Sequence, residues 1–156
     1  MFNRSFRWIV VALTAMSVIG CNTPLANVPQ STQVPSAPVK VAAPDTSKLL
    51  SGSKNFGNNT LWLVSAPNPP VRGNNIFEAV MADATGNSIN DAKVTFDLNM
   101  TNMNMGRNAA LATFQGAGRY SGTVFFSMGG PWRVNVLVQR SGQPDATVQF
   151  NFSISR

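Results

Sequence analysis

Short stretches in which hydrophobic and polar residues alternate, each ended by glycine, proline or asparagine, fill the chain from about residue 60 onward. In residues 93–100, for example, Val94, Phe96 and Leu98 alternate with charged and polar residues, and residues 146–154 follow the same pattern. Because successive side chains of a β-strand point to opposite faces, a period of two predicts half-buried strands. About seven such segments within roughly 100 residues predict an all-β fold, an Ig-like antiparallel β-sandwich.

The turn residues between these segments set the expected strand limits. Pro67, Pro69 and Pro70 end the first strand, and glycine-rich turns separate most of the later ones. We expect strands at residues 60–65, 75–83, 93–100, 109–114, 120–127, 132–140 and 146–154. The domain that they form is expected to span residues 56–156.

The first residues, 1–21, have the features of a targeting segment. Arg4 and Arg7 give a basic start, and the apolar run that follows, residues 8–20, is shorter than the about 20 residues that a membrane span needs. The run ends in Val-Ile-Gly-Cys, which resembles the lipobox of bacterial lipoproteins and predicts lipidation of Cys21. An ordinary signal peptide or a short anchor helix are the alternatives.

Lipid chains on Cys21 would hold the protein at a membrane surface without spanning it. We therefore expect an extracytoplasmic, membrane-anchored lipoprotein, on the periplasmic or cell-surface side. Cys21 is the only cysteine, so the domain that follows has no disulfide and no thiolate site.

Residues 22–55 are expected to be a disordered tether. They are rich in alanine, valine, serine and threonine, with no sustained hydrophobic period, and so have no face to bury. An extended tether of this kind reaches on the order of 100 Å. Lys40, Lys48 and Lys54 make it basic, which favours weak attraction to anionic surfaces. Its prolines are Pro24, Pro29, Pro35, Pro38 and Pro44.

The composition argues against catalysis. The chain has no histidine, which excludes Ser-His catalysis, histidine acid–base chemistry and histidine-ligated zinc. The acidic residues are scattered, and Asp83, Asn87 and Asp91 around Gly86 lack the regular spacing of a calcium loop. We expect no enzyme.

The positive charge does not indicate nucleic acid as a partner. The formal net charge is +6, but the arginines of the domain stand singly and form no basic stripe. The expected partners are the membrane, through the lipid anchor, and another envelope protein.

The methionines are the one group of residues whose type and spacing indicate a specific metal chemistry. Thioether sulfur is soft and neutral and selects Cu(I) or Ag(I) over harder cations. Met103 and Met105, two residues apart, would point to one side of an extended segment, with Met100 entering from the strand end and Met128 as a further ligand. Trp132 would cover the site through a cation–π interaction. The alternative is that the methionines fill gaps at the end of the core, which we favour for Met100 and Met128.

The same stretch carries a family resemblance. Its elements are Met-x-x-Met-x-Met-Gly at residues 100–106, Gly-x-Tyr at 118–120 and Ser-Met-Gly-Gly-x-Trp at 127–132. In this order, between strands, they resemble the YtkA-like family, which includes FixH-type proteins. The resemblance covers about residues 57–154, with its core at 94–138. It implies a small Ig-like domain of the bacterial cell envelope, associated with copper and heavy-metal handling.

The chain departs from the family pattern at two points. Members often carry a proline within the methionine loop, where this chain has Thr101 and Asn102. Some carry histidine near the methionines, and here there is none. Two hypotheses follow: a non-catalytic, lipid-anchored interaction module of the envelope or, alternatively, a Cu(I)- or Ag(I)-binding domain with Cu(I) as its only candidate cofactor.

Overall fold

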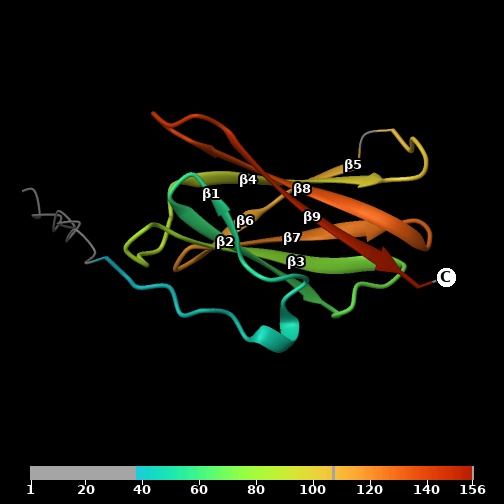
Figure 1. Ribbon diagram of the computed structural model, residues 1–156, viewed down its shortest axis with the longest axis horizontal. Coiled ribbons are helices and arrows are strands. Elements are labelled where there is room, and N and C mark those ends of the chain that lie inside the picture. The colour runs from blue at the N-terminus through green and yellow to red at the C-terminus, as the bar shows by residue number, and fades with distance from the viewer. Residues whose placement is uncertain (1–37, 107, 156) are drawn as a thin grey trace, which may run out of the picture. The chain divides into compact units, whose positions relative to one another are not determined.

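The computed structural model describes residues 38–106 and 108–155 (Figure 1). These residues form two antiparallel sheets, one of five strands in the order β1-β2-β3-β7-β6 and one of four in the order β5-β4-β8-β9. This confirms the expected all-β sandwich. The strands are β1 Lys54–Phe56, β2 Asn59–Ala66, β3 Gly73–Ala82, β4 Ala92–Met100, β5 Asn108–Leu111, β6 Thr113–Gly116, β7 Arg119–Phe126, β8 Gly130–Arg140 and β9 Ala146–Ile154.

The core lies between the sheets and is made mainly by one parity of the long strands; at the end of β3, Val80 and Ala82 of the other parity are buried as well. On β4 the buried residues are Val94, Phe96, Leu98 and Met100, while the residues between them are at least partly exposed. Phe77 of the five-stranded sheet packs edge-on against Phe96 of the four-stranded sheet, with ring centroids 5.9 Å apart. The period of two in the sequence therefore corresponds to one buried and one outward face on each sheet.

The expected single strand at residues 109–114 is in fact two strands in different sheets. β5 pairs with β4 and β6 pairs with β7, so the chain crosses from one sheet to the other at Ala112, whose N–H donates to the Val94 carbonyl at 2.9 Å. The crossing passes close to Gly122 on β7, where a Cβ would lie 3.3 Å from the Leu111 carbonyl oxygen. Glycine at this position makes room for the corner.

The tether expected at residues 22–55 is corrected for its last part, residues 38–55. The Val41 N–H donates to the Gly86 carbonyl at 3.0 Å, and the Leu50 N–H donates to the Leu63 carbonyl at 2.8 Å. Pro44 is buried and Leu50 packs against the core. A short 3₁₀ turn, η1 (Thr46–Lys48), lies between these contacts, and β1 follows.

Single anchoring residues hold this segment. Because they do not form a periodic hydrophobic face, the sequence pattern does not reveal them. The lipobox, Cys21 and the rest of the expected tether lie outside the described residues. Within the part of the chain that the structure describes, no helix has the length and hydrophobicity needed to cross a membrane.

Candidate functional site

The methionine segment forms the connection between β4 and β5. In Figure 1 it projects at the end of the sandwich where β9 and the C-terminus also lie. Met100 ends β4 and is paired in register with Trp132 on β8, and the Thr101 N–H continues the pairing by donating to the Pro131 carbonyl at 3.2 Å. Residues 101–106 are exposed, so the loop begins where the core ends.

Two of the four candidate ligands pack at the end of the core. Met100 is 7% exposed, and its terminal methyl group lies 2.9 Å from the position that a Cβ on Gly130 would take. Met128, between β7 and β8, is half-buried and packs against the same cluster. Glycine at position 130 thus leaves the space that the Met100 side chain fills.

The other two methionines are open to solvent. Met103 is 48% exposed and Met105 39%. A local turn shapes the loop around them: the Asn104 side-chain oxygen accepts a hydrogen bond from the Gly106 N–H at 3.0 Å, and Gly106 has φ +74°. The structure therefore divides the methionines into a packed pair and an exposed pair, and the exposed thioethers are accessible to a ligand.

Trp132 does not have the place that a lid requires. Its side chain is 1% exposed, its ring lies edge-on to Phe126 with centroids 4.9 Å apart, and its indole N–H donates to the Met128 carbonyl at 3.1 Å. A lid would need a ring face open toward the loop, whereas these contacts hold Trp132 inside the core. The lid role expected from the sequence is corrected to a packing role.

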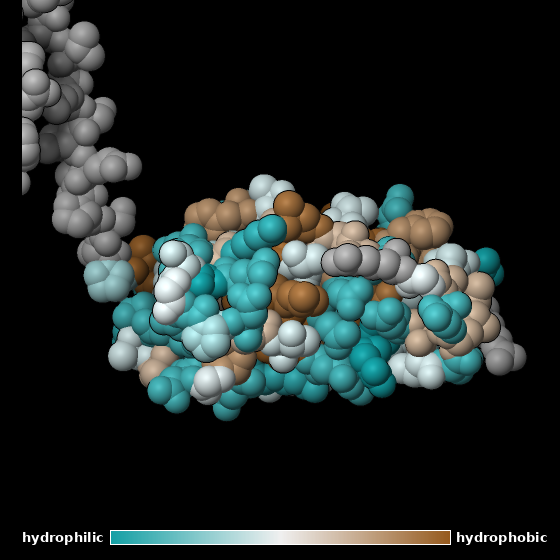
Figure 2. Space-filling view, turned by 90° about the horizontal axis from the view of Figure 1, so that it is seen from above, coloured by the Kyte–Doolittle hydropathy of each residue, from teal (hydrophilic) through white to brown (hydrophobic). Residues whose placement is uncertain are grey.

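A pocket that the sequence did not reveal lies beside the loop. It has a volume of about 480 Å³ on the outward face of the four-stranded sheet. Figure 2 shows the molecule from above, turned by 90° from the view of Figure 1, and hydrophilic residues cover much of this surface. The lining residues are Thr95, Asp97, Asn99, Asn104, Gly106, Ala109 and Leu137. The polar residues that alternate along residues 93–99 indicate an outward-facing side of this strand, but they do not show that the loop folds toward these side chains.

A second groove lies on the outward face of the five-stranded sheet. Its volume is about 400 Å³; Val64, Ala66 and Ile76 contribute apolar side chains, and the ion pair between Arg119 and Glu78 lies within its lining. Residues 43–48 form the opposite wall. This groove could not be foreseen from the sequence, because that wall belongs to the segment expected to be disordered.

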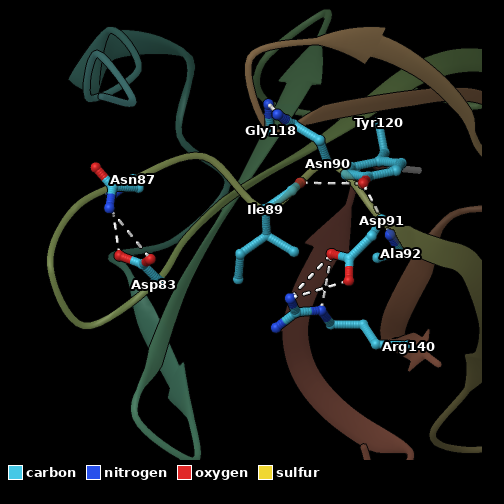
Figure 3. Close-up of polar contacts among 9 residues, drawn as sticks. All are labelled: Asp83, Asn87, Ile89, Asn90, Asp91, Ala92, Gly118, Tyr120 and Arg140. Atoms are coloured by element: carbon cyan, nitrogen blue, oxygen red, sulfur yellow. Dashed lines mark hydrogen bonds and ion pairs between the residues drawn. The ribbon is translucent and has the colours of Figure 1, made fainter. Parts of the chain in front are cut away.

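The polar residues of the β3–β4 connection satisfy one another. The Asp83 carboxylate accepts hydrogen bonds from the Thr85 hydroxyl at 2.7 Å and from the Asn87 N–H at 2.9 Å. These bonds, the Thr85 hydroxyl first, lower the pKa of Asp83 below its ordinary value. Asp91 is turned away from this group and binds Arg140 through two hydrogen bonds, at 3.0 and 3.1 Å (Figure 3). Asp83 and Asp91 therefore have separate hydrogen-bond partners.

Tyr120 fixes the end of the same connection. Its buried hydroxyl donates to the Ile89 carbonyl at 3.0 Å and accepts from the Ala92 N–H at 3.1 Å (Figure 3). Burial is the main cause that raises the pKa of the Tyr120 phenol. The two hydrogen bonds tie β7 to the end of the β3–β4 connection, and their role is structural.

Over residues 38–106 and 108–155, no three or more His, Cys, Asp or Glu side chains come together as metal ligands. The thioethers of the exposed methionines have a metal chemistry of their own, that of a soft monovalent ion.

Comparisons with known proteins match the chain to a family model and to a solved structure. No curated protein matches the chain. The structure is similar to the crystal structure of a DUF4426 family protein from Pseudomonas aeruginosa PAO1, with a TM-score of 0.48 and 14% sequence identity over 67% of this chain and 96% of that one. A family model described as YtkA-like matches residues 58–137, which are more than half of the chain. The chain therefore belongs to the YtkA-like family.

Proposed function

We propose that this chain is a non-catalytic interaction module of the cell envelope, anchored to a membrane by lipid on Cys21 and contacting another envelope protein through its five-stranded sheet. The observation that carries the proposal is the exposure of two large hydrophobic side chains on the outward face of that sheet. Ile76 on β3 is 52% exposed and Phe125 on β7 is 54% exposed. Exposed apolar groups that adjoin one another mark sites of protein contact.

The register shows that these two side chains adjoin. Asn74 pairs with Phe125 and Ile76 pairs with Thr123, so Ile76 and Phe125 are diagonal neighbours on one face. Ala66 pairs with Ile76 on the other side and extends the apolar strip to β2 and the groove. An apolar centre bordered by the Arg119–Glu78 ion pair resembles the core and rim of a protein interface.

Cross-linking tests this surface. A photo-reactive amino acid at position 125 of the full chain should give a defined cross-linked species in the producing cell, and the added substitution Ile76→Ser should remove it by breaking the apolar strip. The control position is Thr147, exposed on β9 of the other sheet. Equal cross-linking from positions 125 and 147 would show that the five-stranded sheet is not the contact surface.

Replacing Cys21 tests the anchor. Cys21→Ala should abolish incorporation of labelled fatty acid and either leave uncleaved precursor or release the protein from the membrane fraction, because the acylated thiol is lost. Ser17→Ala, in the same segment, should label and fractionate as the wild type does. A Cys21→Ala protein that is processed and fractionates like the wild type contradicts the lipobox.

The exposure of Met103 and Met105 favours a second candidate function, the binding of one Cu(I) or Ag(I) ion. Two accessible thioethers in one turn supply soft donors. The third donor would be either the half-buried Met128 or the buried Met100. Thioethers carry no proton near neutral pH, so the affinity should hardly change with pH. Zn(II), Ca(II) and Mg(II) should not bind there.

The test is a titration with Ag(I), followed by the methionine methyl signals in NMR spectra. Met103→Leu with Met105→Leu should abolish binding and preserve the fold, because leucine keeps the size and apolar character of methionine. Met81→Leu, a buried change on β3, is the control and should bind as the wild type does. Unchanged Ag(I) binding in the double variant would place the ion elsewhere, and no binding by the wild type well above micromolar Ag(I) would remove this function.

A further inference from the structure

A carboxylate and two amides come together on the outward face of the four-stranded sheet. Asp97 on β4 is paired in register with Asn135 on β8. The Asp97 Oδ2 atom accepts a hydrogen bond from the Asn99 side-chain amide at 3.1 Å and from the Asn135 amide at 3.4 Å. Because the amide nitrogens are held toward Asp97, the orientation of both amide groups is fixed, which leaves their oxygen atoms as acceptors for other donors.

The methionine loop turns this flat group into a pocket. Asn104 and Gly106 from the loop line the space of about 480 Å³ that Asp97, Asn99 and Thr95 line from β4. The hydrogen bond from the Gly106 N–H to the Asn104 side chain holds the loop in a turn at this point. The pocket is thus built from two different parts of the chain, each shaped by its own hydrogen bonds.

The lining mixes hydrogen-bonding and apolar groups. Carboxylate oxygen accepts, amides both donate and accept, and the Thr95 hydroxyl does both, while Ala109 and Leu137 add apolar surface. Among the described residues that line the pocket, Asp97 is the one that carries a charge, so an anionic ligand would meet like charge there. A hard cation would find a single carboxylate, whereas such ions favour several oxygen ligands. Neutral hydroxyl groups, which both donate and accept, match this set of partners.

The polar face continues beyond the pocket toward the edge of the sheet. Asn135 pairs with Gln149 on β9, and the next outward pair on the same two strands is Arg133 with Asn151. The Gln149 amide donates to the Asn151 side-chain oxygen at 3.2 Å. Amide groups therefore extend across β4, β8 and β9 as a flat strip, which suits an elongated ligand better than a single small one.

We propose that the pocket around Asp97, Asn99 and Asn135, together with the amide strip beside it, binds a neutral oligosaccharide. The Asp97 Oδ2 atom already accepts from Asn99 and Asn135, so Oδ1 is the atom that accepts from the sugar hydroxyls. The asparagines donate and accept, and Leu137 packs against the C–H groups of a sugar ring. The site uses neither the thioethers nor the apolar strip of the five-stranded sheet, so it is independent of both functions proposed above.

Titration of the labelled full chain tests this site. The ¹⁵N-labelled protein, purified in a zwitterionic detergent without a sugar headgroup, is titrated with cellotetraose and with chitotetraose. We expect saturable NMR shifts at residues 95–99, 104–106 and 135–137 with at least one of them, and a dissociation constant on the order of 1 mM. Tetragalacturonate, which carries carboxylates, should bind at least about tenfold more weakly because of Asp97.

Variants assign the contacts. Asp97→Ala with Asn135→Ala should weaken binding about tenfold or more, since hydrogen-bond partners of the sugar are lost. Asn104→Ala, in the exposed loop, should also weaken it and carries little risk for folding. Thr123→Ala, which removes an exposed polar group from the other sheet, should leave binding unchanged. The proposal is overturned by the absence of shifts with both neutral sugars, by equal binding of tetragalacturonate, by a response to CaCl₂ alone, or by an Asn104→Ala protein that binds as the wild type does.

Discussion

Trp132→Ala should lower the free energy of unfolding by about 3–5 kcal/mol, the cost of deleting a large aromatic side chain from a packed core. The ring is 1% exposed and lies edge-on to Phe126. Its removal leaves a cavity at the end of the sandwich and also takes the indole N–H away from the Met128 carbonyl, which it reaches at 3.1 Å. Urea unfolding of the chain without residues 1–21, followed by circular dichroism, measures the change.

The matched control for Trp132 is a neighbouring aromatic residue that points outward. Phe125→Ala removes a ring that is 54% exposed, and we expect a loss below about 1 kcal/mol, as for a surface change. Similar losses in the two variants would mean that Trp132 does not belong to the core.

Gly118→Ala should be nearly as damaging, for a different reason. Gly118 has φ +74°, and a Cβ there would lie 2.5 Å from the Met81 carbonyl oxygen. Its N–H donates to the Asn90 side chain at 2.8 Å and its carbonyl accepts from the Met81 N–H at 2.9 Å, so the backbone is held on both sides. The alanine methyl group can be accommodated only by breaking one of these contacts.

Gly142 separates the steric clash from the backbone strain. It has φ +72°, nearly the value at Gly118, but a Cβ there meets nothing within 4 Å. We expect Gly142→Ala to cost about 1 kcal/mol from the left-handed backbone alone and Gly118→Ala to cost about 2–3 kcal/mol more from the clash. Equal losses in urea unfolding would show that the chain relaxes around residue 118 without penalty.

The sequence predicts the long strands well because most of their length has one buried and one outward parity, although both parities are buried at the end of β3. β9 has the expected limits, Ala146–Ile154, and β4 begins one residue earlier than expected, at Ala92. The segment at residues 38–55 was missed because isolated contacts such as those of Pro44 and Leu50 leave no period. The division of residues 108–116 into two strands was missed because alternation along the chain carries no information about which sheet a strand joins.

The candidate sites divide in the same way, into features that the local sequence indicates and features that depend on the folded chain. The exposure of Met103 and Met105 agrees with the asparagines beside them in the sequence, whereas the burial of Trp132 depends on its contacts with Phe126 and Met128 in the folded chain. The pocket at Asp97 arises from cross-strand register and from the path of a loop. Both are tertiary properties, since Asp97 and Asn135 are far apart in the sequence and adjacent only when β4 pairs with β8.

The crossing of the chain at Ala112 has a consequence for how copies of this protein meet one another. β5 and β6, the edge strands on that side of the two sheets, have four residues each, and the turn between them joins one sheet directly to the other. Long, flat strand edges invite pairing with a neighbouring molecule, and short ones suppress it. Lipid anchoring would confine copies of this protein to a plane, where they collide often. The corner at Ala112 leaves little continuous backbone on that side for one copy to extend the sheet of the next, and so favours separate domains at high surface density.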